Sequence, residues 1–467
     1  MTRTNSQRLK YILVDLLTAN IAVFIFDIAR YYVLGGENIG FRSLAAFLTF
    51  KVIIIEQVLI PLLLLGINAL SGYYNRPLLK SRLQELINTI LVAGLQTVMV
   101  FLVLLTNQNT AVRSTNYELL FYLFLLLGGC TYLGRWMVTS YAFRKFRKGK
   151  WKYNILVIGL PDASETKAEN IRQNRGRTGF SLAGIVALNP ADENYGLNFR
   201  ELSEIRDRKD IKEIIFATRG LEESEILKVL YTLIPLCVPV KIATDSLPIL
   251  NSNIRLQSIY EEPYLDVASA NVSDAVKNIK RSFDVLVSLC VLLVLGLPMA
   301  IMSVVIKCTS KGPVIFRQER IGRHRRPFTI YKFRSMRTDA EASGPQLSCE
   351  GDTRITPIGA WMRKYRVDEL PQFWNVVKGD MSLVGPRPER IHFIKLIMQQ
   401  APFYSLVHQV RPGITSWGMV KYGYAKTVDE MVERLRYDLI YLANISITND
   451  LKILIYTVKT VFKGRGV

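Results

Sequence analysis

The sequence predicts a chain in three parts: a membrane α-helical bundle of about four spans, a Rossmann-like α/β domain, and a mainly α-helical domain with a re-entrant membrane helix. Three observations predict this order. Apolar runs dominate residues 1–150, and short Val- and Ile-rich runs alternate with polar helical segments over 151–270. One long apolar run, 283–306, interrupts the basic stretch 271–467. A chain of 467 residues is long enough for two or three domains.

Each of four apolar stretches in the first part is long enough to cross about 30 Å of hydrocarbon. They lie near 11–34, 44–70, 86–106 and 117–141. Basic residues gather before the first, between the second and third, and after the fourth, whereas the other two loops carry only Arg42 and Arg113. The positive-inside rule therefore predicts that both ends of the bundle are cytoplasmic. The alternative is four buried helices of a soluble protein, which Asp15 and Asp27 would favour unless they face the bundle interior.

Residues 151–270 have the pattern of a small parallel α/β sheet. Their short apolar runs lie at 154–159, 182–188, 214–218 and 238–243. Gly159 ends the first run as in a dinucleotide-binding turn, but the residues after it lack the remaining glycines of G-x-G-x-x-G. A structural or regulatory role is therefore favoured over cofactor binding.

The apolar run 283–306 predicts a helix that enters one leaflet and returns. Its length would allow a full crossing, yet both flanks are basic, with Lys280 and Arg281 before it and Lys307 after it. Both flanks therefore favour the same, cytoplasmic face. Pro298 removes a backbone donor inside the run and is expected to break the helix. A straight crossing is the alternative, and it would place the basic domain on the other side of the membrane.

The formal charge of +21 predicts polyanionic partners. Because the chain has membrane segments, anionic lipid and phosphorylated ligands are favoured over nucleic acid. The five cysteines are scattered without a CxxC pair, and there are three histidines. A disulfide framework, a structural zinc site and His-based metal chemistry are therefore not expected.

Several basic residues of the third part lie next to Gly and Pro turns. They are Lys332, Arg334, Arg363, Arg387 and Arg411. The planar fork of arginine suits bidentate phosphate contacts. Any one of them alone is better explained as a solvated surface charge, whereas five beside fixed turns favour a phosphate pocket.

Asp368 and Glu369 form an adjacent acidic pair that follows Arg363, Lys364 and Arg366. A carboxylate can attack phosphorus and hold a covalent phosphoryl intermediate, and its neighbour can bind Mg²⁺. The basic neighbours would keep both groups ionised. The alternative is an exposed pair near a helix N-terminus, where the macrodipole stabilises acidic side chains.

Five motifs make the last 190 or so residues similar to one family. They are Lys280-Arg-Ser-Phe-Asp284, Tyr331-Lys-Phe-Arg-Ser-Met336, Val367-Asp-Glu-Leu-Pro-Gln372, Lys378-Gly-Asp-Met-Ser382 and Gly385-Pro-Arg-Pro388. Together they resemble the catalytic domain of the bacterial sugar transferases, the monotopic polyprenyl-phosphate phosphoglycosyl transferases. The four spans and the α/β domain further resemble the large form of this family, which starts capsule, exopolysaccharide or O-antigen (lipopolysaccharide) units.

The resemblance implies an enzyme that moves a sugar 1-phosphate from a UDP-sugar to polyprenyl (undecaprenyl) phosphate and releases UMP. Asp368 would be the nucleophile that holds the phospho-sugar covalently, and Glu369 would be the Mg²⁺ ligand. Arg363 and Arg387 match arginines that contact phosphate.

The implied setting is the cytoplasmic face of a bacterial inner membrane. The re-entrant helix would keep both of its ends at that face, so Lys280 and Arg281 would lie near the carrier phosphate. The partners would be a UDP-sugar, polyprenyl phosphate and membrane lipid, with no nucleic acid and with a homodimer left open. Departures from the family pattern at Ser416 and over 421–424 leave the sugar undetermined.

Two other functions are left open by the residues themselves. A membrane-tethered nucleotide-sugar dehydratase or oxidoreductase would use NAD in 151–270, but that segment has neither the glycine fingerprint nor a Tyr-x-x-x-Lys pair. A non-catalytic scaffold for polysaccharide export would leave Asp368 and Glu369 free to vary. Release of UMP from a UDP-sugar distinguishes the first function from both.

Overall fold

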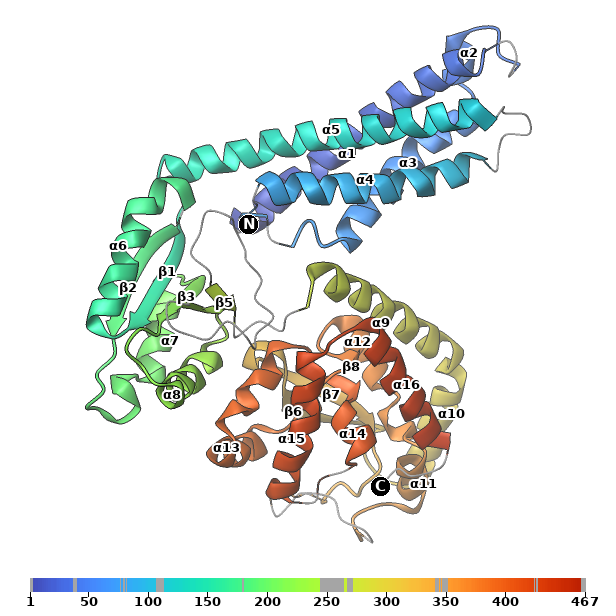
Figure 1. The fold of residues 1–467 in the computed structure, drawn as a ribbon. Helices are drawn as coiled ribbons and strands as arrows, with labels where there is room; N and C mark the ends of the chain where they lie inside the picture. Colours follow the sequence, from blue (N-terminus) through green and yellow to red (C-terminus); the bar gives the residue numbers. More distant parts are fainter. Residues whose placement is uncertain are drawn as a thin grey trace. The chain divides into compact units, whose positions relative to one another are not determined.

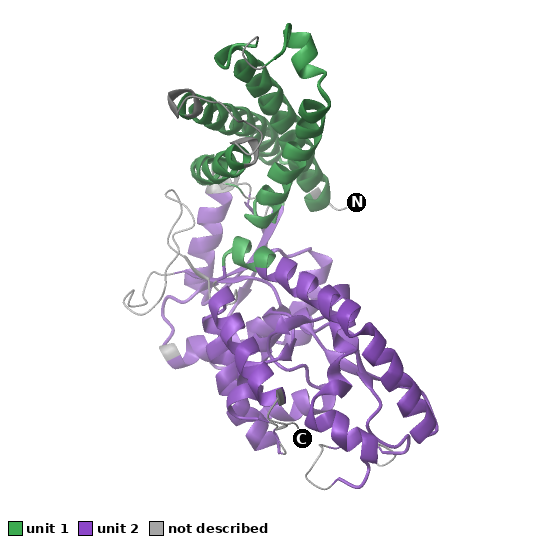
Figure 2. Cartoon of the chain, turned by 90° about the vertical axis from the view of Figure 1, so that its right-hand side faces the viewer, with its two compact units in different colours: residues 1–152, 175–179, 273–279 green, residues 153–174, 180–272, 280–467 purple. Residues whose placement is uncertain are grey.

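The computed structural model describes residues 3–36, 40–75, 77–78, 80, 82–105, 113–178, 180–243, 264–266, 272–340, 344, 346, 352–423, 425 and 427–462. The chain forms two compact units (Figure 2). Unit 1 consists of Met1–Lys152, Arg175–Gly179 and Ser273–Ile279. Unit 2 consists of Tyr153–Asn174, Phe180–Val272 and Lys280–Val467. The predicted domain boundary at 270–271 lies outside the described residues.

Unit 1 contains a helical bundle. Its helices are α1 (Arg3–Val33), the short α2 (Leu44–Leu48), α3 (Lys51–Leu70), α4 (Arg82–Leu105) and α5 (Arg113–Arg147) (Figure 1). Within the described ranges, four of these helices are long and apolar enough to cross a membrane: α1, α3, α4 and α5. The prediction of about four apolar N-terminal helices is confirmed.

Acidic and basic side chains in the bundle are buried and lie next to partners of opposite charge. Asp15 accepts hydrogen bonds from Arg135 at 2.9 Å and 2.7 Å and from the hydroxyl of Tyr74 at 2.7 Å. Arg30 contacts Asp27 at 3.9 Å and Glu56 at 3.1 Å. Charges inside apolar helices are tolerated in this arrangement, because each has a counter-charge within the bundle. Asp15 and Asp27 are therefore compatible with a membrane bundle.

In unit 2, residues from 153 onward form an α/β layer. Its sheet has the order β2-β1-β3-β4-β5, with β5 antiparallel and the other strands parallel. The strands are β1 (Tyr153–Gly159), β2 (Phe180–Ala187), β3 (Glu213–Ala217), β4 (Val240–Ala243) and β5 (Tyr264–Asp266). The helices are α6 (Pro161–Thr178), η1 (Glu193–Gly196), α7 (Phe199–Arg208), α8 (Glu223–Leu233) and η2 (Ile234–Leu236).

Helices cover both faces of this sheet. Successive side chains of a strand point to opposite faces, so each strand contributes to both cores. In β1, Ile155 and Val157 pack with Ile171 of α6, whereas Leu156 and Ile158 pack in the cluster that includes Leu202 of α7 and residues of α8. A strand buried on both faces needs apolar residues at every position. This explains the unbroken run Ile155–Ile158.

The apolar run 283–306 lies in two helices, α9 (Asp274–Val294) and α10 (Gly296–Thr309), bent by 61° at the break between them. Pro298 occupies the first turn of α10, so the break lies one turn before the predicted position. A proline lacks the donor for the carbonyl four residues earlier and clashes with it, and for Pro298 that residue is Val294. The proline thus accounts for a bend that begins ahead of it.

The remaining residues of unit 2 form a helix-rich region with short strands. Its first half contains β6 (Ile315–Ile321), η4 (Arg323–Arg325), β7 (Pro327–Phe333), α11 (Pro357–Lys364), η5 (Val367–Glu369), α12 (Gln372–Lys378) and β8 (Ser382–Val384). Its second half contains α13 (Ile391–Gln400), η6 (Pro402–Gln409), β9 (Gly413–Thr415), α14 (Trp417–Lys421), α15 (Val428–Ala443) and α16 (Ile447–Phe462). One core gathers α13, η6 and α15, and another gathers β7, α12, β8 and α16.

Candidate active site

A sharp reversal of the backbone places Asp368 and Glu369. Helix α11 ends at Lys364, and Arg366 then adopts a left-handed conformation, with φ 55°. The following turn, η5, is closed by the bond from Glu369 N to the carbonyl of Arg366 at 3.2 Å. Asp368 is 7% exposed and Glu369 5% exposed. The pair is therefore buried, and the alternative of an exposed acidic pair is wrong.

The next helix holds this turn against the β6–β7 hairpin. Asn375 of α12 donates to the carbonyl of Thr329 at 2.7 Å and accepts from the backbone N–H of Tyr331 at 3.1 Å. These two bonds tie α12 to β7, the strand that carries Lys332 and ends just before Arg334. Lys332 of β7 donates to Glu369, whereas Arg334, which follows the last residue of the strand, donates to Ser310.

Glu369 lies among three cations. Its Oε1 accepts from Lys332 at 2.9 Å and lies 3.9 Å from Arg387, and its Oε2 lies 3.6 Å from Arg366. Burial by itself would raise the pKa of Glu369, but the attraction of Lys332, Arg366 and Arg387 outweighs it and lowers the pKa to about 2. Glu369 is therefore ionised throughout the neutral range.

The pKa of Asp368 is shifted in the opposite direction. Burial raises its pKa to about 6, the nearby charge of Glu369 adds to the rise, and Lys332, Arg363 and Arg366 oppose it. Two adjacent carboxyl groups with pKa values shifted apart are typical of functional pairs, because each group can then take a different role. Asp368 is ionised at neutral pH and keeps more basicity than an ordinary aspartate.

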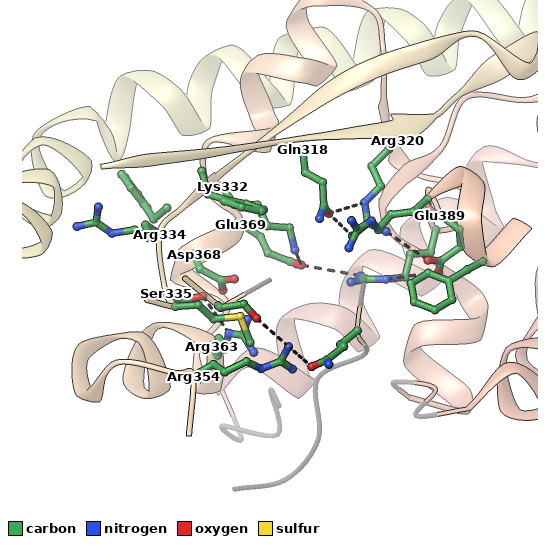
Figure 3. A pocket seen from close by; sticks show the side chains of 18 of the residues that line it. Gln318, Arg320, Lys332, Arg334, Ser335, Arg354, Arg363, Asp368, Glu369 and Glu389 are labelled. Carbon is green, nitrogen blue, oxygen red and sulfur yellow. Dashed lines mark hydrogen bonds and ion pairs between the residues drawn. The ribbon is translucent and has the colours of Figure 1, made fainter. Parts of the chain in front are cut away.

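Both acids line a cavity of about 440 Å³, which is within the range of small-molecule sites (Figure 3). Four of the predicted binding residues line it as well: Lys332, Arg334, Arg363 and Arg387. Arg363 donates to the hydroxyl of Ser335 at 2.9 Å, and Arg334 donates to the carbonyl and hydroxyl of Ser310 at 2.7 Å each. The cavity therefore combines the acidic pair with an excess of cations over acids, as a phosphorylated ligand requires.

The turn that carries Arg387 depends on a glycine. A Cβ on Gly385 would lie 2.4 Å from the carbonyl oxygen of Arg411. This close approach lets Gly385 N donate to Thr415 O at 3.0 Å and Gly413 N donate to Pro386 O at 2.9 Å. Two backbone bonds thereby fix the start of the turn.

Three of the predicted binding residues are not among the residues that line the cavity. Lys280 donates to Asp450 at 2.5 Å and to the carbonyl of Val384 at 3.1 Å. Arg281 donates to the carbonyls of Val376 and Val377, and Arg411 donates to that of Gly379 at 2.9 Å. In the described structure these three side chains bind the protein's own acceptors.

Several further residues line the cavity that sequence patterns did not predict as site residues. They include Gln318, Arg320, Arg354, Glu389, Arg390 and Arg434. Glu389 directly follows the motif Gly385–Pro388, so proximity to a motif was a usable signal for this residue. Arg434 lies in the amphipathic helix α15, where an arginine is normally expected to be a solvated surface charge.

Ser416, one of the departures from the family pattern, has a local structural role. Its side chain accepts from Met419 N at 3.0 Å and caps α14, and the residue is 1% exposed. Of the other departure, 421–424, Tyr424 lies outside the described residues.

A Mg²⁺ ion suits the donor set only together with a substrate. In the part of the chain that the structure describes, no three His, Cys, Asp or Glu residues gather into a metal site. Mg²⁺ is usually held by one or two carboxylates plus substrate phosphates and water. Glu369, ionised and facing the cavity beside Asp368, fits that pattern.

The region of the chain that contains this cavity is similar to known proteins. Residues 275–464 match the model of the family described as "Bacterial sugar transferase". A UDP-N-acetylgalactosamine-undecaprenyl-phosphate N-acetylgalactosaminephosphotransferase of Aeromonas hydrophila is 44% identical over 188 residues, which cover 40% of this chain and 44% of that protein. The matched stretch thus spans less than half of this relative.

Two further relatives extend the comparison in different ways. The UDP-glucose:undecaprenyl-phosphate glucose-1-phosphate transferase of Escherichia coli (strain K12) is 29% identical over 318 residues, 67% of this chain and 68% of that protein, so the likeness reaches beyond the C-terminal region. The exopolysaccharide production protein PSS of Rhizobium leguminosarum bv. phaseoli is 40% identical, and the match covers 40% of this chain and 98% of that protein. With a relative of this identity covered almost entirely, the chain belongs to the bacterial sugar transferase family.

Proposed function

We propose that the chain transfers a sugar 1-phosphate from a UDP-sugar to undecaprenyl or another polyprenyl phosphate, as the first step in building a capsule, exopolysaccharide or O-antigen unit. The observation that carries the proposal is the pair Asp368 and Glu369, buried in a cationic cavity with pKa values shifted in opposite directions. Family membership and the activities for which the relatives are named point the same way.

Asp368 is the nucleophile of the proposed reaction. A carboxylate oxygen of Asp368 forms a bond to the phosphorus that carries the sugar, and the bond from that phosphorus to the UMP oxygen breaks, so UMP leaves with the electron pair. An oxygen of the polyprenyl phosphate then attacks the same phosphorus. The bond to Asp368 breaks, the carboxylate is restored, and polyprenyl-diphospho-sugar is formed.

The cations of the cavity stabilise charge on the transferring phosphate. Lys332, Arg363 and Arg387 come from three separate segments, β7, α11 and the turn after β8, so they can approach a phosphate from different sides. Glu369, with the substrate diphosphate, would hold Mg²⁺. When bound, the ion neutralises phosphate charge and stabilises the leaving group.

The membrane arrangement is part of the proposal. α9 and α10 expose large apolar side chains, among them Leu286, Leu293, Leu297, Ile301 and Val304. Large apolar side chains exposed along both helices suit a lipid environment. We take the bent pair as a re-entrant helix that keeps the catalytic region at the cytoplasmic face of the inner membrane, and the α/β layer as a Rossmann-like domain with a structural or regulatory role.

Topology can be tested directly. Single cysteines placed at 272 and 312, in a protein freed of its native cysteines, should both react with an impermeant thiol reagent only from the cytoplasmic side. Labelling at 312 from the periplasmic side would exclude the re-entrant arrangement while leaving the chemistry untouched.

The chemistry is tested by UMP release. Purified protein is mixed with Mg²⁺, polyprenyl phosphate and each of a panel of UDP-sugars, including UDP-glucose and UDP-N-acetylgalactosamine because relatives are named for both. The proposal expects UMP release with at least one sugar, parallel double-reciprocal plots, and a phospho-sugar trapped on the wild-type protein but not on Asp368→Asn. Wild-type turnover by Asp368→Asn would exclude the covalent mechanism.

A further inference from the structure

A third buried carboxylate, Glu389, lines the same cavity. It follows the Gly385–Pro388 turn and is 4% exposed. Its Oε1 accepts from Arg434 at 2.6 Å, and its Oε2 accepts from Arg320 at 3.3 Å. Arg387 approaches it as well, with Nε 3.9 Å from Oε1. Glu389 therefore faces guanidinium groups from β6, from its own turn and from α15.

Arg387 lies between the two glutamates. Its Nη1 is 3.9 Å from Oε1 of Glu369, and its Nε is 3.9 Å from Oε1 of Glu389. The same Nη1 lies 3.3 Å from the sulfur of Met419. Both ion pairs are at the outer limit of direct contact, so neither carboxylate draws the guanidinium fully to its own side.

Glu389 is well held in its ionised form. Burial would raise its pKa, but Arg434, Arg320 and Arg387 together keep the pKa below its ordinary value. Arg320 is further oriented by Gln318, whose Oε1 accepts from its Nε at 3.0 Å and its Nη2 at 2.7 Å. Figure 3 shows Glu389, Arg320 and Gln318 joined in this way, beside the part of the cavity that holds Glu369.

The charge of Glu389 balances the pull of Glu369 on Arg387. Without the negative charge of Glu389, the guanidinium groups of Arg320, Arg387 and Arg434 would repel one another. Glu369 would then be the carboxylate that attracts Arg387. The guanidinium would then close onto Glu369, which would remove a phosphate donor and neutralise the carboxylate beside the nucleophile.

We propose that Glu389 is a positioning residue, which holds the Arg387 guanidinium between the two carboxylates so that it meets the transferring phosphate. The inference rests on the proposed function, because it assigns Arg387 to that phosphate. Glu389 itself acts through Arg387 and needs no contact with the substrate.

The test is a double-mutant cycle on UMP release. Glu389→Gln keeps the shape of the side chain and removes its charge, and kcat/KM is expected to fall about 100-fold because a catalytic group is misplaced. In an Arg387→Gln background the same change should alter kcat/KM by less than about twofold, since the two residues act as one unit. Multiplicative effects of the two substitutions, or a fully active Glu389→Gln protein, would overturn the inference.

A matched control separates positioning from the general cost of losing a buried charge. Glu213 of the α/β layer is also 4% exposed and pairs with Lys241 at 2.7 Å. Glu213→Gln should lower the unfolding temperature comparably and leave kcat/KM unchanged. If Glu389→Gln does not fold, the cycle is run with Glu389→Asp and Arg387→Lys, where additive effects again overturn the inference.

The activity of the wild-type protein separates a failure of the proposed function from a failure of the positioning role of Glu389. Absence of UMP release from the wild type with every UDP-sugar counts against the proposed function. An active wild type with an equally active Glu389→Gln variant counts against the positioning role alone.

Discussion

Replacing the nucleophile should make the protein more stable while it abolishes turnover. Asp368 is 7% exposed, and burial, the largest cause, raises its pKa from 3.8 to about 6. At about 1.4 kcal/mol per pKa unit, holding Asp368 ionised in the folded state costs about 3 kcal/mol. Asparagine has nearly the same shape and no charge, so Asp368→Asn should recover up to that amount at pH 8.

The pH dependence gives this prediction its sign. The pKa of Asp368 is higher in the folded state than in the unfolded state. The free-energy cost of ionising Asp368 in the folded protein is therefore absent below about pH 4, grows between pH 4 and pH 6, and is complete above pH 6. The free energy of unfolding, measured by denaturant titration of the detergent-solubilised protein, should therefore favour Asp368→Asn at pH 8 and be equal for the two proteins near pH 4. A variant less stable than wild type at pH 8, or a gain that does not change with pH, would refute the reasoning.

Three further predictions concern the cavity and the bundle. The rate of UMP release should rise as pH increases through about 6, where Asp368 loses its proton, and a flat profile from pH 5 to pH 8 would contradict the assignment. Lys332→Met removes the cation that lies 2.9 Å from Glu369 and lowers the pKa of Asp368. The midpoint of the pH profile should therefore move to higher pH, and kcat/KM should fall at least about 10-fold. An unmoved midpoint would show that Lys332 does not act on Asp368. Arg135→Leu leaves buried Asp15 without its main counter-charge and should lower stability by about 3–5 kcal/mol, whereas adding Asp15→Asn should restore part of it; additive losses measured by thermal unfolding would argue against the pair.

Local sequence patterns were sufficient to predict much of this structure. Length and apolarity were sufficient for the four helices of the bundle, because a span depends on composition over some 20 residues rather than on distant partners. The pair Asp368–Glu369 and the basic residues beside turns were visible because each motif is continuous in the chain. Four of the predicted binding residues share the cavity with this pair.

Partners that are far apart in the chain could not be read in the same way. Lys280 meets Asp450 across 170 positions, and Arg281 meets the carbonyl of Val376 across 95, so a basic flank that suggested lipid phosphate is used within the protein. Arg434 reaches Glu389 across 45 positions, and nothing in its local helix pattern marks it as a cavity residue. Side-chain partnership of this kind depends on tertiary packing, which a single sequence does not display.

The left-handed backbone at Arg366 makes this position subject to two opposing selective demands. An L-residue other than glycine in this conformation costs roughly 1–2 kcal/mol, so backbone strain alone would select glycine there. The guanidinium 3.6 Å from Glu369, however, can be supplied only by a residue with a long cationic side chain. A lineage that drifted to glycine would gain a relaxed turn and weaken the charge balance of the acidic pair. Substitutions at 366 should therefore arise together with compensating basic residues elsewhere around the cavity.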